Sequence, residues 1–109
     1  MTFATTLFLL LVGHALADYP LQGDFLAKAK DVTKPLPSVP WYWAMSAHAM
    51  IHAGAVFAVT GSLVLAFCEF LLHWVLDEAK CLGLLSFSQD QIGHILCKIA
   101  WSALAGAMP

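Results

Sequence analysis

The sequence predicts an all-α protein, an integral membrane four-helix bundle with short connectors, and two observations carry this prediction. Hydrophobic residues make up 61% of the 109 residues and charged residues only 11%, and the mean hydropathy is +0.78. Soluble chains are about 45–50% apolar and about 25% charged, and a small soluble domain has too much surface to hide such a composition. The apolar residues also form four long segments separated by polar connectors or a turn, as expected for membrane helices.

The bundle is predicted as a single membrane domain over residues 1–109, with helices at residues 2–19, 40–60, 62–79 and 88–107. The first helix is predicted because residues 1–17 contain no charged side chain, and Pro20 ends it. Residues 18–40 hold half of the charged residues and are expected to form a polar connector. A short surface helix is expected within it, at residues 24–30.

The second and third helices are predicted from residues 41–76, where Glu69 is the one charged residue. This stretch is too long for one span of about 20 residues, so the Thr60-Gly61-Ser62 sequence is expected to be a turn between two antiparallel helices. A second connector leads to the fourth helix. A capping box is predicted there, with Ser88 as the N-cap and Gln91 as its N3 partner.

The lysine positions predict the orientation of the bundle. Lys28, Lys30 and Lys34 lie in the first connector and Lys80 in the second, whereas the central turn carries no basic residue. Both connectors of a four-helix bundle lie on the same side, so the positive-inside rule makes that side cytoplasmic and places both termini outside. An alternative interpretation takes residues 1–17 as a cleaved signal peptide, but residues 1–6 lack the positive charge of such peptides.

Several classes of protein do not fit this composition. Five lysines, no arginine and a net charge of −2 argue against a nucleic-acid partner. The three cysteines form no Cys-x-x-Cys pair, so neither a zinc finger nor a complete disulfide framework is expected. The lipid bilayer is the expected partner, and oligomerisation is an open alternative.

The histidines form the most specific pattern in the chain. Each of the five has a histidine or an aspartate four residues away, and each of the four predicted helices carries one such pair. The pairs are His14/Asp18, His48/His52, His73/Asp77 and Asp90/His94. Residues at i and i+4 lie on one face of a helix, one above the other. Because ionisable side chains are costly against lipid, all four pairs are expected to face the inside of the bundle.

The pairs also fall at matching depths. In the first and third helices the aspartate is nearer the connectors, and in the fourth helix, which runs the other way, the order along the sequence is reversed. The two members of a pair lie about 6 Å apart along the helix axis. The sequence therefore predicts two layers of polar side chains. The upper layer holds Asp18, His48, Asp77 and Asp90, and the lower layer holds His14, His52, His73 and His94.

Such a constellation favours a divalent metal ion, since histidine and aspartate are ligands of zinc, manganese and iron. Zinc is the first expectation, with manganese and iron as alternatives. The di-iron signature Glu-x-x-His is absent, which favours Lewis-acid or hydrolytic chemistry over oxygen activation. All eight residues of the two layers are candidate metal ligands. Three of them are also candidate catalytic bases or bridging ligands, namely Asp18, Asp77 and Asp90.

Other polar residues extend this candidate site. Glu69, four residues before His73, is predicted to be either a general base or a structural partner of a bundle histidine. Gln22 and Gln91 flank the upper layer and are candidates for hydrogen bonds to a ligand. Lys98 lies within a predicted span and has no obvious partner in the sequence.

At these residues the chain resembles an uncharacterised family of small integral membrane proteins of bacteria and their phages. The matching segments are GHALADYPLQ at residues 13–22, then residues 48–52, HWVLD at 73–77 and DQIGH at 90–94. The resemblance covers nearly the whole chain but implies no activity, since the family has none assigned. It implies an integral membrane protein of bacteria, so a multi-pass protein of the inner membrane is expected, and the lysine positions make the site face the cytoplasm. A looser similarity, in having histidine and aspartate on hydrophobic helices, is to membrane-bound metal-dependent hydrolases.

The expected function is therefore that of a membrane metalloprotein with its site at the cytoplasmic end of the bundle, hydrolysing an ester or phosphoester of a lipid-like substrate. Two alternatives stay open. The same residues could carry a metal ion or protons in a transporter or binding protein, although the opposite half of the bundle offers few polar residues. The chain could also be a structural membrane module without catalysis, whose buried polar layers specify how the helices pack.

Overall fold

The computed structural model describes residues 1–108, and this part of the chain forms five α-helices. They are α1 (Phe3–Asp18), α2 (Gly23–Ala29), α3 (Trp41–Thr60), α4 (Leu63–Cys81) and α5 (Phe87–Ala107). The all-α prediction is confirmed. The four long helices correspond to the four predicted ones, and α2 is the short helix expected in the first connector, one residue earlier than predicted.

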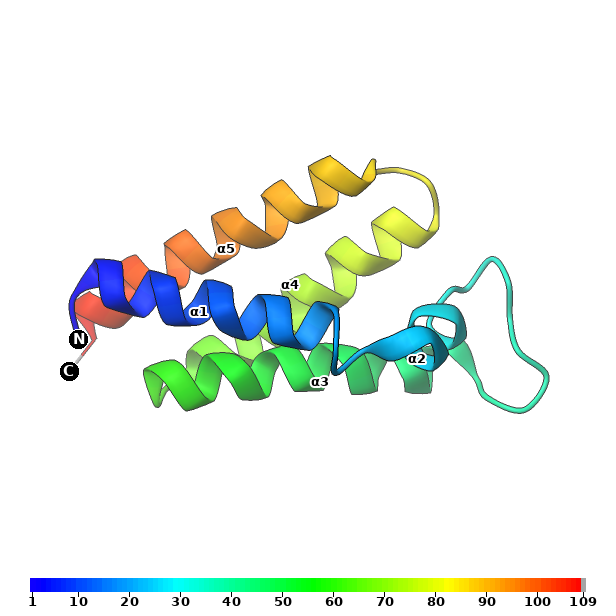
Figure 1. Cartoon of the computed structure of the whole chain (residues 1–109), viewed down its shortest axis with the longest axis horizontal. Helices are drawn as coiled ribbons and strands as arrows, with labels where there is room; N and C mark the ends of the chain where they lie inside the picture. Colours follow the sequence, from blue (N-terminus) through cyan, green and yellow to red (C-terminus); the bar gives the residue numbers. More distant parts are fainter. Residues whose placement is uncertain (109) are drawn as a thin grey trace.

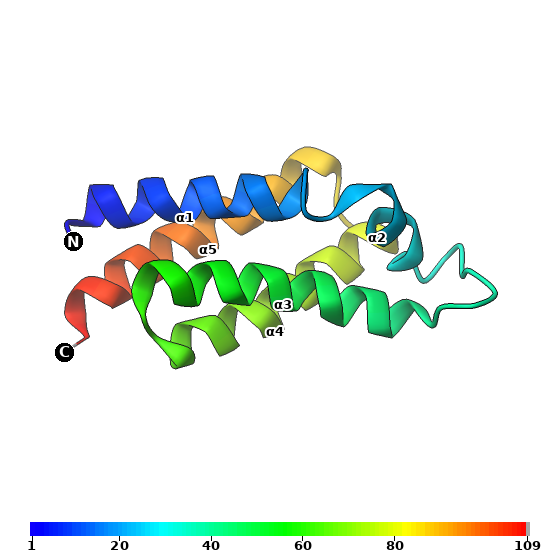
Figure 2. The ribbon, with the colours of Figure 1, turned by 60° about the horizontal axis from the view of Figure 1, so that its bottom comes forward.

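The chain forms an elongated body of 45 × 24 × 21 Å, along which the four long helices run (Figure 1). α1 packs against α3 and α5, and α4 packs against the same two helices. The start of α1 and the end of α5 lie together at one end of the body (Figures 1 and 2). The opposite end, here called the connector end, holds α2, the loop that follows it and the connector between α4 and α5.

The predicted turn between the second and third long helices is present. Gly61 ends α3 in the left-handed conformation, with a φ of 69°, and its N–H donates to the carbonyl oxygen of Phe57 at 2.7 Å. A residue with a side chain is strained at such a φ, which explains why glycine stands here. The Ser62 hydroxyl then accepts from the N–H of Leu65 and caps the start of α4.

The capping box predicted for the fourth helix was wrong by two residues. Ser86, not Ser88, is the N-cap of α5, and Gln89, not Gln91, is its N3 partner. The Ser86 hydroxyl accepts from the N–H of Gln89 at 3.1 Å, and the Gln89 side chain accepts from the N–H of Ser86 at 2.9 Å. The two Ser-x-x-Gln sequences overlap, and the start of α5 selects the earlier one. This leaves the side chain of Gln91 free for other contacts.

Replacing Ser86 by alanine is expected to lower the free energy of unfolding by about 1 kcal/mol, because an N-cap hydroxyl is lost. The measurement is chemical unfolding in a fixed detergent, followed by circular dichroism. Ser88→Ala is the matched control, since Ser88 is exposed within the first turn of α5 and caps nothing. A larger loss for Ser88→Ala than for Ser86→Ala would contradict the observed helix start.

The interior of this bundle is polar to an unusual degree. Among residues 1–108, eleven buried residues are hydrophobic and twelve are polar or charged. An apolar cluster lies toward the end that holds the start of α1, and it is formed by Leu10, Val56, Leu65 and Trp101. Many large apolar side chains lie on the outside instead. Phe8, Phe67 and Ile92, for example, are each more than half exposed. Water is a poor solvent for such an outer surface.

By length and hydropathy, one bent pair of helices meets the criteria for a membrane span. Taken singly, no helix within residues 1–108 is both long and apolar enough to qualify as a span, whereas α1 and α2 qualify as a pair that is bent by 81°. The four predicted spans thus stay a prediction.

Candidate metal centre

The four predicted pairs come together inside the bundle. Each long helix supplies one of them: His14 and Asp18 from α1, His48 and His52 from α3, His73 and Asp77 from α4, and Asp90 and His94 from α5. Seven of these eight residues are buried, and the side chain of Asp18 is 12% exposed. The i,i+4 spacing turns both members of each pair inward, because they share one helix face.

These eight residues are here called the polar cluster, and His73 lies at its centre. Its ring stacks on the ring of His52, with centroids 3.6 Å apart, and its centroid is 4.1 Å from that of His94. Its Nε2 atom lies 3.2 Å from Nε2 of His48. Two imidazole nitrogens at this distance need a proton or a cation between them, because two lone pairs that face each other repel.

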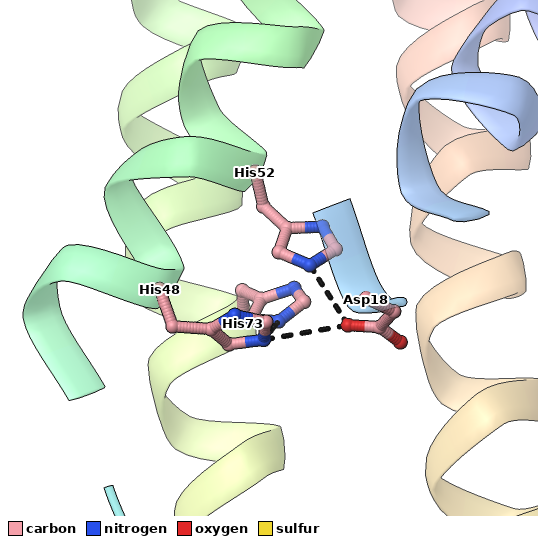
Figure 3. Close-up of side chains that lie close together, drawn as sticks. All are labelled: Asp18, His48, His52 and His73. Carbon is pink, nitrogen blue, oxygen red and sulfur yellow. Dashed lines mark hydrogen bonds and ion pairs between the residues drawn. The ribbon is translucent and has the colours of Figure 1, made fainter. Parts of the chain in front are cut away.

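One candidate ligand group surrounds Asp18. Asp18, His48, His52 and His73 each offer one ligand atom, and these atoms all lie within 4.8 Å of one another. Oδ1 of Asp18 lies 2.9 Å from Nε2 of His52 and 3.3 Å from Nε2 of His48 (Figure 3). Three imidazole nitrogens and one carboxylate oxygen are a donor set that zinc accepts in a tetrahedral site.

A second candidate group adjoins the first and shares His73 with it. It consists of His73, Asp77 and His94, whose ligand atoms also lie within 4.8 Å of one another. Asp77 lies between the histidines: Oδ2 is 3.7 Å from Nε2 of His73, and Oδ1 is 3.5 Å from Nε2 of His94. Oδ2 of Asp77 is also 3.2 Å from Nε2 of His48, so Asp77 connects the two groups.

The predicted ligands His14 and Asp90 lie beside these groups and not within them. Nε2 of His14 is 3.2 Å from Oδ2 of Asp18, and Oδ1 of Asp90 is 3.2 Å from Nε2 of His94. Each of them thus contacts one member of a group. Neighbours of this kind fix the orientation of a metal ligand.

Lys30 is a member of the site that sequence reasoning missed. It follows α2 directly and is only 5% exposed, although it was assigned to a polar connector. Its Nζ donates to Oδ2 of Asp77 at 2.6 Å. No spacing rule links Lys30 to Asp77, because the bend between α1 and α2 brings them together. The signal that could have found it is the rarity of lysine in a chain with so few charges.

The two glutamines differ in what they contact. Gln91, freed from the predicted capping role, donates from Nε2 to Oδ2 of Asp18 at 3.2 Å, and its Oε1 lies 3.1 Å from Nε2 of His14. It therefore connects α5 to the pair on α1. Gln22 donates to the backbone carbonyl oxygen of Asp18, and its own Oε1 is buried without a hydrogen-bond partner.

Glu69 and Lys98 form a buried ion pair on the far side of His73 from the connector end. Nζ of Lys98 bonds to Oε1 of Glu69, and the two residues are 1% and 0% exposed. Lys98, which had no obvious partner in the sequence, is thus paired. Oε2 of Glu69 lies 3.8 Å from Nδ1 of His73, the ring nitrogen that points away from the cluster centre. Glu69 therefore lies next to the ring nitrogen of His73 that is on the other side from the candidate metal site.

Comparison with known proteins confirms the predicted membership of an uncharacterised family. A family described as "Protein of unknown function (DUF3307)" matches residues 6–108, which include every residue of the cluster. The chain belongs to this family. No curated protein and no solved structure shows significant similarity to the chain.

The charge of the cluster in this DUF3307 chain suits a divalent cation. Three carboxylates, those of Asp18, Asp77 and Asp90, face one ammonium group, that of Lys30. Protonated His48 and His94 can compensate these carboxylates. When the rings bind a metal they are neutral, and two of the negative charges then have no ammonium partner in the buried site. One divalent cation carries the opposite charge, and the converging nitrogen and oxygen atoms are the ligands it needs.

Proposed function

We propose that the chain is an integral membrane protein with a divalent metal centre at the cytoplasmic end of its bundle, and that it hydrolyses an ester or phosphoester of a lipid-like substrate. The convergence of imidazole nitrogens and carboxylate oxygens around His73 carries the proposal. Zinc suits the group of three histidines and Asp18 best, with manganese and iron as the alternatives.

The distribution of side chains supports a membrane location. Polar residues lie inside the bundle and large apolar residues outside, which is the arrangement that lipid favours. α3, α4 and α5 contain 20, 19 and 21 residues. Helices of this length extend about 30 Å, the thickness of the hydrocarbon core of a bilayer. Tyr42 and Trp43, at the start of α3, are 52% and 68% exposed, as interfacial aromatic residues are.

The chemistry follows from what borders the cluster. Asp18 and Asp77 line a cavity of about 120 Å³ at the connector end, through which a substrate can reach the ligand groups. A divalent cation held by the ligand groups would polarise the ester as a Lewis acid and would make a nearby water easier to deprotonate. Asp18 is placed to accept that proton, because Gln91 holds its Oδ2 next to the cavity. The water oxygen bonds to the phosphorus or carbonyl carbon, the bond from that atom to the alcohol oxygen breaks, and the alcohol leaves with the proton that Asp18 returns.

The same arrangement disfavours transport as the function. The apolar cluster of Leu10, Val56, Leu65 and Trp101 fills the bundle between the metal ligands and the opposite end. A metal ion or proton that crossed the bundle would have to pass this apolar cluster, and the polar side chains buried beside it, Thr6 and Ser102, carry no charge. A site that can be reached from one end of the bundle suits catalysis better than transport across the membrane.

The proposal is tested by metal analysis of protein that remains in membranes after an alkaline carbonate wash. We expect the native chain to stay in the membrane fraction and, after detergent extraction without chelators, to contain stoichiometric metal. The double variant His52→Ala/His73→Ala should contain none, because both candidate groups lose a ligand. Asp24→Ala removes a carboxylate whose side chain is 97% exposed, and this control should keep its metal.

Three results would contradict the proposal in different ways. Release of the native chain by carbonate would contradict the membrane location. Absence of metal from the native chain would contradict the metal centre. Metal uptake by cells, without hydrolysis of phosphoesters by the metal-loaded protein, would favour the transport alternative over hydrolysis.

A further inference from the structure

The cavity at the connector end has a cationic side that the metal ligands do not explain. Lys30 and Lys80 line it, and they come from two different segments, the end of α2 and the last turn of α4. Asp18 and Asp77 also line the cavity, and each of them belongs to one of the two ligand groups. Anything bound in the cavity therefore lies between two ammonium groups and the candidate metal centre.

The two lysines differ in the side chains that they contact. Nζ of Lys80 lies over the ring of Phe87, 5.4 Å from its centroid, and no carboxylate pairs with it in residues 1–108. Lys30 is paired with Asp77 alone, at 2.6 Å, and its side chain is only 6% exposed. A buried ammonium group is costly unless a negative charge compensates it.

A divalent cation and Lys30 compete for the same carboxylate. Asp77 belongs to the second candidate ligand group, and its Oδ2 already accepts from Lys30. When a cation takes up the negative charge of Asp77, the buried ammonium group of Lys30 loses its compensation. An anion in the adjoining cavity restores it, so metal binding and anion binding reinforce each other.

The size and lining of the cavity indicate which anion fits. About 120 Å³ holds a few water molecules, at about 30 Å³ each, and thus a compact anion. Lysine binds phosphate well as a point charge. Gln22 lines the cavity, and its buried Oε1 has no hydrogen-bond partner, so this oxygen can accept from a hydroxyl group. Phosphate has the required charge and can present such a hydroxyl at its oxygen or on its alcohol.

From these observations we infer that the cavity binds the phosphate monoester group of the substrate, held by Lys30 and Lys80 beside the metal centre. This inference rests on the proposed metal centre and names the substrate class that the centre meets. The phosphate monoester belongs to a lipid headgroup or to a soluble compound, and both present the same phosphate group to the two lysines.

The test is calorimetric titration of inorganic phosphate into detergent-purified protein, either metal-free or loaded with zinc and desalted. We expect zinc to raise the affinity for phosphate by at least about tenfold. Lys30→Gln and Lys80→Gln should each lose about tenfold or more in phosphate affinity. Lys28→Gln is the matched control, since Lys28 is an exposed lysine of α2 that does not line this cavity, and it should bind phosphate like the native chain.

Titration with zinc alone separates this inference from the proposed function. Lys30→Gln should bind zinc at least as tightly as the native chain, because a competitor for Asp77 is gone. If the native chain binds no zinc, the metal centre itself is wrong. If zinc binds but phosphate affinity is unaffected by zinc or by both lysine substitutions, the phosphate site is wrong and the metal centre stands. Lys80→Gln keeps the test valid if Lys30→Gln fails to fold, because Lys80 is in no buried ion pair.

Two further titrations identify the source of the phosphate group. Glycerol 3-phosphate represents the soluble compounds, and phosphatidic acid in phosphatidylcholine nanodiscs represents the headgroups. Lysine-dependent binding of either supports the inference and names the source. Binding of neither overturns it.

Discussion

Replacing His73 by alanine is expected to abolish stoichiometric metal binding, with an affinity loss of more than about 100-fold. Loss of a residue that merely orients a ligand costs about 10–100-fold. His73 should exceed this range because it is the one residue shared by both candidate groups. Its ring also lies between those of His52 and His94, so its removal leaves a gap at the centre of the cluster. The measurement is competition titration of zinc against a chromophoric chelator in detergent.

His14 supplies the matched comparison for this variant. It is a histidine of the same cluster, but it lies outside both groups and contacts Oδ2 of Asp18 instead. His14→Ala should therefore retain stoichiometric zinc, with an affinity reduced by about 10–100-fold. Equal losses for the two variants would mean that His14 is itself a ligand, as the sequence alone predicted. An unchanged affinity in His73→Ala would exclude both groups.

Much of the site could be predicted from the sequence because its pattern is local. Two residues four apart share a helix face whatever the rest of the chain does, so His73 and Asp77 had to point the same way. The alternation of helix direction then fixed which member of each pair lies nearer the connectors. The contact between Asp18 and His48 and the stacking of His52 on His73 lie within the predicted layers. Other contacts join the two layers, as those of Asp18 with His52 and of His48 with His73 do.

The remaining members of the site depend on non-local geometry. Lys30 reaches Asp77 because the chain bends by 81° between α1 and α2, and no periodic pattern encodes that bend. Gln91 was assigned to the helix cap because two Ser-x-x-Gln sequences overlap, and packing decides which of them begins α5. The membrane prediction came from composition, and composition does not say which lengths of helix enter a bilayer.

The ion pair between Glu69 and Lys98 shows a third limit, since each residue was visible in the sequence but their pairing was not. They lie on different helices, α4 and α5, and meet because these helices pack against each other. Both side chains are almost fully buried, at 0% and 1% exposure. A buried pair of this kind costs much of its own attraction in lost hydration, so its contribution is best measured by breaking it.

Replacing Lys98 by methionine is expected to lower the free energy of unfolding by about 3–5 kcal/mol, because it leaves the carboxylate of Glu69 buried without its cation. Adding Glu69→Leu should recover most of that loss, since an apolar pair of similar volume replaces both charges. The measurement is chemical unfolding in a fixed detergent. Lys28→Met is the control and should leave stability unchanged. Lys28 is exposed, and its ion pair with Asp24, at 4.0 Å, lies at the surface where such pairs contribute little.

The double variant also decides what the pair does for His73. Oε2 of Glu69 lies 3.8 Å from Nδ1 of His73, on the opposite side of the ring from the candidate metal. Neither atom has a hydrogen-bond partner at this distance, and a closer approach on metal binding would fix the tautomer in which Nε2 is free to bind a metal. If Glu69 acts in this way, the double variant should regain most of the native stability and yet bind zinc about 10–100-fold more weakly. Unchanged zinc affinity would leave the pair a purely structural role between α4 and α5, and a stable Lys98→Met single variant would contradict the buried charge itself.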